Sequence, residues 1–325
     1  MKANYNEVVD KLKEIYGVDK VYSYSQVKLY TDDLYEYYLK YVAKVKPDKT
    51  TSSPYGVIGG MVHDILEKFY KNEIKRSDCK TLFIEQFNHL MNLPTTGVFS
   101  QDHAQNRTIS DNFIRDIDDY FDRVEKLEGK VFCEEPIGCL LENCNTKAVF
   151  MGYIDFLNFN KDKVYIIDYK TSNIYKEKDI PKYSRQLILY AESVRKKYGI
   201  KYDNIIVGWN FLKYAKLINK VDLSEEIVER KDLYKYDLDN YVVEDCIITI
   251  DFNESIEEDF NEYICNTVRE IENRVKIYED LHDDSIFMYE VNQSHMFRLT
   301  NFCNYSEKYH RPLREYLERN KNIYA

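Results

Sequence analysis

The sequence predicts an α/β fold in which a mixed central β-sheet is flanked by helices. Three observations support this prediction: the N-terminal third has helical periodicity, the centre has β-branched runs of strand length, and the C-terminal third combines both patterns. The chain has 325 residues, of which 44% are hydrophobic and 31% charged, as in globular proteins. We expect a helical N-terminal portion at residues 1–130 and an α/β core at residues 131–325, together forming one compact unit.

The helices of the N-terminal portion are expected from periodicity and start signals. The segment MKANYNEVVDKLKEIYG has an amphipathic helical pattern. Ser52-Ser53 before Pro54 is typical of a helix start, and this helix is expected to reach about Lys71 and to carry His63 beside an apolar stripe. The next expected segments are amphipathic helices at residues 82–93 and 108–127 and an exposed loop at residues 92–107.

The centre and the C-terminal third predict the sheet. Residues 150–159 and 164–171 have the pattern of two strands joined by a short loop at residues 160–163. The later expected elements are a helix at residues 183–198, strands at residues 205–212 and 246–252, and a long helix at residues 257–281. The acidic segment at residues 222–245 lacks clear periodicity, so we expect an insertion that forms a loop or a protein-contact surface.

Charged side chains in the central hairpin indicate a metal site. Side chains alternate along a strand, so Asp168 and Lys170 share one face of the second strand. A hairpin with a symmetric loop places Asp155 directly opposite Asp168, where two carboxylates repel unless a divalent cation binds both. The alternative is an exposed salt bridge to Lys161 or Lys163, which fits the apolar surroundings of the aspartates less well.

The net charge of −10 is unusual for a protein that binds nucleic acid, because Lys and Arg dominate phosphate contacts. The charge is uneven, however. Residues 222–262 contain 15 Asp or Glu against three Lys or Arg, whereas the basic C-terminal tail at residues 296–325 contains six Lys or Arg against three Glu. Four more basic residues follow the second hairpin strand: Lys176, Lys178, Lys182 and Arg185. They are explained equally well as a nucleic-acid path or as solvated surface charges, since local potential governs steering.

Other features exclude some classes of protein. The seven cysteines are scattered, odd in number and lack a Cys-x-x-Cys pair, so we expect reduced thiols and a cytoplasmic protein. Cys133, Cys139 and Cys144 lack the spacing of a zinc site and are expected to be buried thiols. The sequence has no apolar run long enough to cross a bilayer and no phosphate-binding loop of an ATP motor.

Four sequence segments occur in the order of motifs in a known family. They are Ser23-Tyr24-Ser25-Gln26-Val27-Lys28-Leu29-Tyr30, Gly59-Gly60-Met61-Val62-His63, Gly152-Tyr153-Ile154-Asp155 with Asp168-Tyr169-Lys170-Thr171, and Gln186-Leu187-Ile188-Leu189-Tyr190. Together they resemble the PD-(D/E)XK nuclease superfamily in its RecB-like branch. The resemblance covers residues 22–198 and implies a restriction-endonuclease-like core. A single Asp-x-Lys segment recurs by chance in many chains, whereas four segments in order are specific.

The resemblance implies a catalytic centre that binds Mg²⁺ or Mn²⁺. The metal ligands that it implies are His63, Asp155, Asp168 and the backbone carbonyl of Tyr169. Imidazole binds Mn²⁺ better than Mg²⁺, so Mn²⁺ is expected to support activity well. Lys170 is the expected catalytic lysine, which offsets negative charge at the phosphorus, and Gln186 is expected to support the site. The alternatives are an ordinary partly buried His63 and a Lys170 that only neutralises the aspartates.

Three residues close to that centre in the sequence are expected to contact the substrate: Lys182, Arg185 and Tyr190. Tyr190 shares a helix face with Gln186 and is explained equally well as a core residue. Some members of the branch carry an iron–sulfur cluster, which needs four cysteines. Here Asp32-Asp33 takes the place of the first cysteine and Cys303 stands alone near the C-terminus, so no cluster is expected.

The resemblance implies metal-dependent hydrolysis of DNA, most simply by an exonuclease of recombination, repair or genome processing. One alternative is a structure-specific or nicking endonuclease with the same site. Another is a catalytically weak accessory protein that binds DNA or a protein through its acidic segment. RNA is also compatible with the site as a substrate. Expected partners are DNA and a helicase, recombinase or other DNA-processing protein, with no membrane, and a homo-oligomer is compatible with the sequence.

Overall fold

The computed structural model describes residues 5–49, 54–93, 99–100, 102–141 and 148–320. The chain forms two compact units, each built from separate stretches of sequence. Unit 1 comprises Met1–Lys2, Ser53–Ile137 and Tyr153–Glu257, and unit 2 comprises Ala3–Ser52, Gly138–Gly152 and Glu258–Ala325. The units interleave along the chain, whereas the division expected from the sequence is a single boundary after residue 130.

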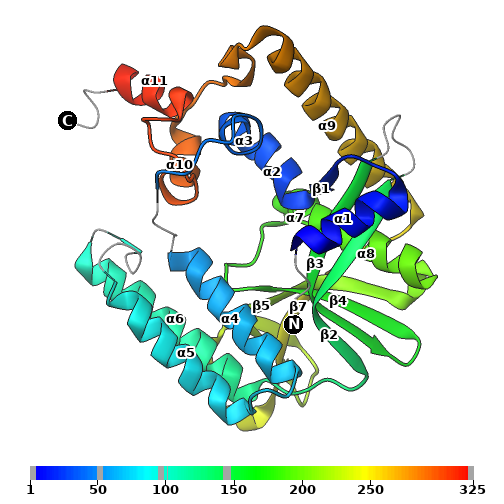
Figure 1. Cartoon of the computed structure of the whole chain (residues 1–325). Coiled ribbons are helices and arrows are strands. Elements are labelled where there is room, and N and C mark those ends of the chain that lie inside the picture. Colours follow the sequence, from blue (N-terminus) through cyan, green and yellow to red (C-terminus); the bar gives the residue numbers. More distant parts are fainter. Residues whose placement is uncertain (1–4, 50–53, 94–98, 101, 142–147, 321–325) are drawn as a thin grey trace. The chain divides into compact units, whose positions relative to one another are not determined.

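In the described part of the chain, seven strands form a mixed sheet in the order β1-β3-β4-β5-β6, with β2 beside β3 and β7 beside β5. The strands are β1 (Val21–Ser23), β2 (Lys130–Leu141), β3 (Ala148–Asn160), β4 (Lys163–Lys170), β5 (Ile205–Asn219), β6 (Glu225–Glu229) and β7 (Tyr241–Ile250). Strand β4 is antiparallel to β3 and parallel to β5. The mixed sheet and the helices of each unit (Figure 1) confirm the predicted α/β fold class.

Five described α-helices lie wholly within unit 1. They are α4 (Pro54–Tyr70), α5 (Arg76–Met91), α6 (His103–Arg123), α7 (Ile180–Tyr183) and α8 (Arg185–Tyr198). Figure 1 shows α4, α5 and α6 lying side by side. The apolar stripe of α4, which includes Ile58, Val62 and Ile65, shares one core with Phe156 of β3 and Tyr169 of β4. The helical spacing of these apolar residues fixes which side of α4 faces the hairpin.

The predicted helices of unit 1 are confirmed with shifted boundaries. The helix beginning at Pro54 is present, although its predicted serine cap lies outside the described residues. The helix predicted at residues 108–127 begins earlier, at His103, because the Asp102 side chain accepts hydrogen bonds from two backbone N–H groups of its first turn. The predicted loop is therefore wrong at residues 103–107.

The acidic segment at residues 222–245 is more ordered than its composition suggests. It contains β6, two short 3₁₀ helices and the first residues of β7. Strand β5 is also longer than the strand predicted at residues 205–212, because its second half pairs with β6 and β7. Strands β6 and β7 expose both polar and apolar residues. The sequence of the segment therefore lacks the alternation of polar and apolar residues that predicts a half-buried strand. The prediction of a loop is wrong here, and a protein-contact role stays a prediction.

Unit 2 is largely helical in its described residues. It contains α1 (Tyr5–Tyr16), α2 (Tyr24–Asp32), α3 (Leu34–Tyr37), α10 (Met296–Asn301), α11 (Arg311–Arg319) and most of α9 (Glu254–Leu281). Ser23 caps α2 by accepting a hydrogen bond of 3.1 Å from the Gln26 N–H. Strand β1 pairs in parallel with the part of β3 that belongs to this unit, with Val21 beside Val149.

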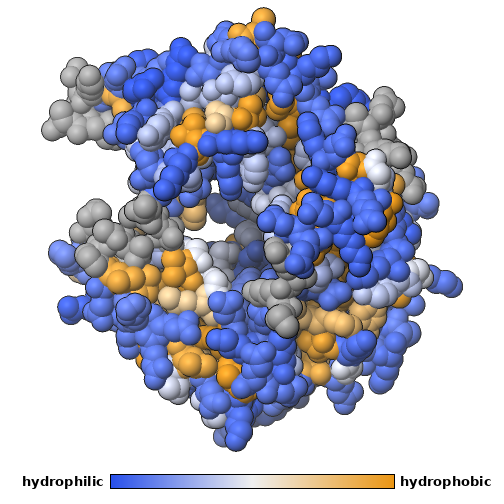
Figure 2. Space-filling model, in the orientation of Figure 1, coloured by the Kyte–Doolittle hydropathy of each residue, from blue (hydrophilic) through white to orange (hydrophobic). Residues whose placement is uncertain are grey.

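The face of the molecule shown in Figure 2 is mostly hydrophilic, with apolar patches between the polar residues. None of the described helices combines the length and the apolar character that crossing a bilayer requires. Five of the described cysteines are free thiols: Cys79, Cys133, Cys139, Cys246 and Cys303. Cys265 is disulfide-bonded, so the expectation of reduced thiols is wrong at this residue. Cys144 lies outside the described residues.

Candidate active site

The hairpin of β3 and β4 brings two aspartates together. Its cross-strand pairs extend to Phe156 beside Ile167, and the next position in this register pairs Asp155 with Asp168. This is the register predicted from the symmetric loop. The backbone N–H of Tyr169 also donates a hydrogen bond to Asp155 Oδ2, at 3.3 Å. The Asp155 carboxylate therefore reaches across to the strand that carries Asp168.

Helix α4 places His63 against the same hairpin. The residue follows the buried Val62 and keeps 26% of its side chain exposed. Its Nε2 lies 2.9 Å from the Tyr169 carbonyl oxygen, and its Nδ1 lies 3.5 Å from Asp155 Oδ2. Three of the metal ligands predicted from the sequence therefore meet at one place: His63, Asp155 and the Tyr169 carbonyl.

Lys170 pairs with Asp168 on the strand face that they share. The distance from Lys170 Nζ to Asp168 Oδ2 is 2.5 Å. Burial lowers the pKa of Lys170, but the charge and hydrogen bond of Asp168 together with Tyr175 and Asp155 more than offset this effect, so the pKa is raised overall and the ammonium is retained. This contact is compatible with both roles predicted for Lys170, catalysis and neutralisation of the aspartates.

The charge of Asp155 is poorly balanced by its surroundings. Burial raises the pKa of Asp155 well above its usual range, and the neighbouring Asp168 raises it further. A bound divalent cation reverses both effects because it favours the ionised carboxylates. Carboxylate oxygens, a backbone carbonyl and one imidazole form a ligand set that suits Mg²⁺ or Mn²⁺. The residues present therefore fit the predicted cation.

Glu134 of β2 joins this group, although no sequence motif indicated it. A carboxylate oxygen of Glu134, a ring nitrogen of His63 and a carboxylate oxygen of Asp155 lie within 4.8 Å of one another. The backbone φ angle of Glu134 is 54°, in the left-handed region that residues other than glycine rarely adopt. The only sequence signal is weak: Glu134-Glu135 interrupts the apolar residues of its strand.

Helix α8 carries the other predicted site residues. Gln186 Nε2 donates a hydrogen bond of 2.6 Å to Tyr190 Oη, which confirms that the two side chains share one helix face. Tyr190 is buried, with 5% of its surface exposed, as its alternative assignment to the core requires. Arg185 is half-buried at the start of α8, whereas Lys182 of α7 is exposed.

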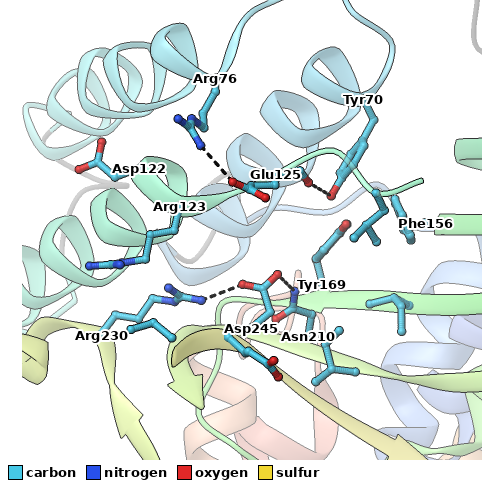
Figure 3. Close-up of a pocket in the computed structure, with 15 residues that line it drawn as sticks. Tyr70, Arg76, Asp122, Arg123, Glu125, Phe156, Tyr169, Asn210, Arg230 and Asp245 are labelled. Atoms are coloured by element: carbon cyan, nitrogen blue, oxygen red, sulfur yellow. Dashed lines mark hydrogen bonds and ion pairs between the residues drawn. The ribbon is translucent and has the colours of Figure 1, made fainter. Parts of the chain in front are cut away.

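A separate pocket of about 760 Å³ lies on the other face of the hairpin (Figure 3). Its lining includes the hairpin side chains that alternate with the two aspartates: Phe156, Ile167 and Tyr169. Charged groups in this pocket pair with each other. Arg76 lies 3.7 Å from Glu125, and Arg230 lies 2.9 Å from Asp245. The pocket is therefore distinct from the carboxylate site, and its arginines already have carboxylate partners.

Unit 2 contains a second group of metal-ligating side chains. Asp33, Cys303 and His310 are buried, and one potential ligand atom of each lies within 4.8 Å of the others. An arginine already neutralises this group. Arg298 Nη1 lies 2.5 Å from Asp33 Oδ2, and Arg298 Nη2 lies 2.7 Å from Glu36 Oε2.

Both ring nitrogens of His310 are also engaged by protein groups. Nδ1 accepts a hydrogen bond of 3.2 Å from the Leu313 N–H, so Nε2 carries the ring proton and donates to Asp33 Oδ1 at 3.0 Å. Burial raises the pKa of Cys303 to about 12, which keeps this thiol neutral. The group in unit 2 therefore satisfies its charges with protein partners.

The comparison with protein families identifies the family of the chain. The family model of the PD-(D/E)XK nuclease superfamily matches residues 21–305. The chain belongs to the PD-(D/E)XK nuclease superfamily. The predicted superfamily and its α/β core are thus confirmed for this nuclease, while the RecB-like branch stays a prediction. No curated protein matches the nuclease.

Proposed function

We propose that this nuclease is a DNA exonuclease that uses Mg²⁺ or Mn²⁺ to hydrolyse phosphodiester bonds. The observation that carries the proposal is the meeting of His63, Asp155 and Asp168 beside Lys170, from one helix and one hairpin. Nucleases of DNA recombination, repair or genome processing need this chemistry at DNA ends. Membership of a nuclease superfamily supports the reaction class, and the preference for DNA ends is part of the proposal.

The metal ligands in this proposal are His63, Asp155, Asp168 and the Tyr169 carbonyl. A divalent cation held by them supplies a Lewis acid for the scissile phosphate and lowers the pKa of water. Lys170 keeps a positive charge beside Asp168, where it stabilises negative charge developing at the phosphorus. The hydrogen bond from His63 Nε2 to the Tyr169 carbonyl fixes the orientation of the imidazole ring towards Asp155.

The residues of α7 and α8 form the substrate side in this proposal. Gln186 supports the site by holding Tyr190 in place through its hydrogen bond. The positive charges of Lys182 and Arg185 attract the phosphate backbone, and Tyr190 contributes aromatic packing beside it. Local positive charge of this kind allows DNA binding by a chain with a net charge of −10.

The test uses linear DNA labelled at either end and a closed circular DNA, each with Mg²⁺, Mn²⁺ or EDTA. The wild type is compared with Asp168→Ala, Lys170→Ala and the control Asp162→Ala, which removes an exposed carboxylate from the hairpin turn. We expect metal-dependent loss of linear DNA in the wild type and the control, with circles intact. Cleavage of circles would assign an endonuclease. Absence of cleavage, or equal cleavage by the Asp168 and Lys170 variants, would contradict the proposed site.

A further inference from the structure

Two tyrosine rings stack on each other beside the candidate active site of unit 1. Tyr175 follows β4 in the chain, and Tyr183 is the last residue of α7. Their ring centroids lie 4.1 Å apart, and the angle between the ring planes is 17°. Nucleobases stack on aromatic side chains in the same parallel arrangement. Tyr175 contributes to the raised pKa of Lys170, so it lies close to this lysine.

Two aromatic residues of β5 support the tyrosine pair. The rings of Trp209 and Phe211 meet Tyr175 edge-on, with centroid distances of 5.2 Å in both cases. Trp209 is paired with Asp168, and Phe211 with Lys170, in the parallel register of β4 and β5. Paired residues of neighbouring strands project from the same face of a sheet, and the strands lie about 4.8 Å apart. The tyrosine pair is therefore supported by the sheet face that carries Asp168 and Lys170, one strand away from them.

The two tyrosines differ from their support in exposure. The side chains of Trp209 and Phe211 are almost fully buried, with 2% and 0% exposed, as is usual for core residues. Tyr175 and Tyr183 are only partly buried. The core aromatics hold the pair in place, and solvent reaches it. A preorganised, partly exposed stack offers a planar apolar surface that a further ring can extend at little entropic cost.

The chain between the two tyrosines carries exposed positive charge. Residues 176–182 contain three lysines, all exposed, and two acidic residues. Aromatic rings beside lysines are the usual combination in sites for unpaired nucleic acid, where the rings stack with bases and the lysines attract phosphates. A tyrosine ring covers one base rather than a base pair. The ligand that fits this surface is therefore a single unpaired nucleobase with its phosphate.

We propose that Tyr175 and Tyr183 form a stacking site for one unpaired nucleobase next to the scissile phosphate. The base extends the tyrosine stack, while the scissile phosphate lies beside Asp168 and Lys170, one strand away. This inference rests on the proposed nuclease function and makes a strand end with unpaired bases the preferred substrate. It assigns substrate contacts to two residues that none of the sequence motifs contains.

The test compares three linear DNA duplexes in Mn²⁺. They differ only in the two nucleotides that end each strand, which carry matched bases, mismatched bases or no base. Mismatched and abasic ends are both unpaired, so they differ in the rings available for stacking. We expect the wild type to cleave the mismatched end at least about fivefold faster than the abasic end, the factor that stacking of one base on an aromatic ring supplies. We also expect it to cleave the mismatched end faster than the matched end, because a matched pair must first open.

Three variants test whether the tyrosine pair causes this discrimination. Tyr183→Leu is expected to reduce the difference between mismatched and abasic ends to about twofold or less. Tyr183→Phe keeps the ring and is expected to keep the difference. The matched control Tyr234→Leu removes another tyrosine of unit 1, which is 71% exposed, and is expected to cleave all three duplexes as the wild type does. Circular dichroism of each variant verifies that it is folded.

The wild-type rates keep the inference testable even if Tyr183→Leu does not fold, because the three duplexes are compared without any substitution. Equal cleavage of mismatched and abasic ends by a wild type that degrades linear DNA would overturn the stacking site and leave the proposed function intact. Full discrimination in folded Tyr183→Leu would overturn the assignment to this tyrosine pair. A matched end cleaved as fast as the mismatched end would overturn the preference for unpaired bases. Failure of the wild type to cleave any DNA would overturn the proposed function together with this inference.

Discussion

The two groups of metal-ligating side chains in this nuclease differ in how their charges are balanced. Each combines a histidine with carboxylates that are distant in the sequence. In unit 2, Arg298 pairs with both Asp33 and Glu36, and His310 donates to Asp33. The resulting network is buried, and protein groups satisfy its charges. A cation brought to it would have to displace the arginine.

The group in unit 1 is balanced less completely at Asp155. Burial and the neighbouring Asp168 raise the pKa of Asp155 well above its usual range, whereas Lys170 pairs with Asp168. His63, Glu134 and Asp155 are also partly exposed, so an ion from solution can reach them. The comparison shows that ligand types and spacing alone do not identify a metal site. The balance of charge and the access of solvent are the features that distinguish the proposed site in unit 1 from the buried network in unit 2.

The largest expected effect is on catalysis. Asp155→Asn is expected to lower the rate of DNA cleavage by about 10³-fold or more, because it removes a ligand and its negative charge from the proposed cation site. The exposed hairpin residue Asp162 provides the control, since Asp162→Asn is expected to keep the wild-type rate. Single-turnover cleavage of end-labelled DNA measures both variants. A cleavage rate in Asp155→Asn within a factor of three of wild type would contradict the assignment.

The next effect is on the stability of unit 2. Arg298→Met leaves the buried carboxylates of Asp33 and Glu36 without their cation, which is expected to cost about 3–5 kcal/mol of unfolding free energy. Arg314→Met removes an exposed arginine of α11 and is expected to change stability by less than about 0.5 kcal/mol. Urea denaturation measures both. Equal stabilities of the two variants would show that the network is not structural.

Stability is expected to change with pH in opposite directions for Asp155 of the unit 1 group and Asp33 of the unit 2 group. The pKa of Asp155 is raised by burial and by Asp168. Without metal, the contribution of Asp155 to stability is therefore lost as the pH rises above the pKa of an aspartate in the unfolded chain, which is about 4. Burial raises the pKa of Asp33, but His310 and Arg298 lower it by more, so the pKa is lowered overall. Its contribution is therefore present above pH 4 and lost as pH falls below it.

Denaturation in EDTA over a range of pH tests both signs. Asp155→Asn is expected to become more stable than wild type as pH rises from about 4 towards neutrality, and Mg²⁺ is expected to reduce this difference. Asp33→Asn is expected to be less stable than wild type above about pH 4, and this difference is expected to shrink as pH falls below 4. The same sign for both variants would contradict the contrast between the groups.

The smallest expected effect concerns the backbone of Glu134. Glycine adopts a φ angle of 54° without steric cost, so Glu134→Gly is expected to stabilise the metal-free protein by about 1 kcal/mol relative to Glu134→Gln. Thermal denaturation in EDTA compares these two variants, which both lack the carboxylate. If Glu134→Gly is the less stable of the two, the left-handed conformation is not a source of strain.

The features that were predictable from the sequence depend on local patterns. The symmetric loop between β3 and β4 sets the register that brings Asp155 opposite Asp168, and alternation along β4 places Lys170 on the same face. The helix of His63 follows from its apolar stripe and from Pro54 at its start. Each of these features involves residues that are close together in the sequence.

The features that were missed depend on long-range packing. Glu134 enters the site through an unusual backbone angle and through the placement of β2, neither of which leaves a periodic pattern. The unit 2 network joins Asp33 to residues more than 260 positions later, with separations of 265 for Arg298 and 277 for His310. Nothing in the local sequence of Asp33 specifies those partners.

The most direct test of the contrast between the two groups is anomalous diffraction from crystals of the nuclease soaked in Mn²⁺. We expect manganese peaks beside Asp155 and none among Asp33, Cys303 and His310. A manganese peak at the unit 2 group, or its absence beside Asp155 in crystals of active protein, would contradict this expectation.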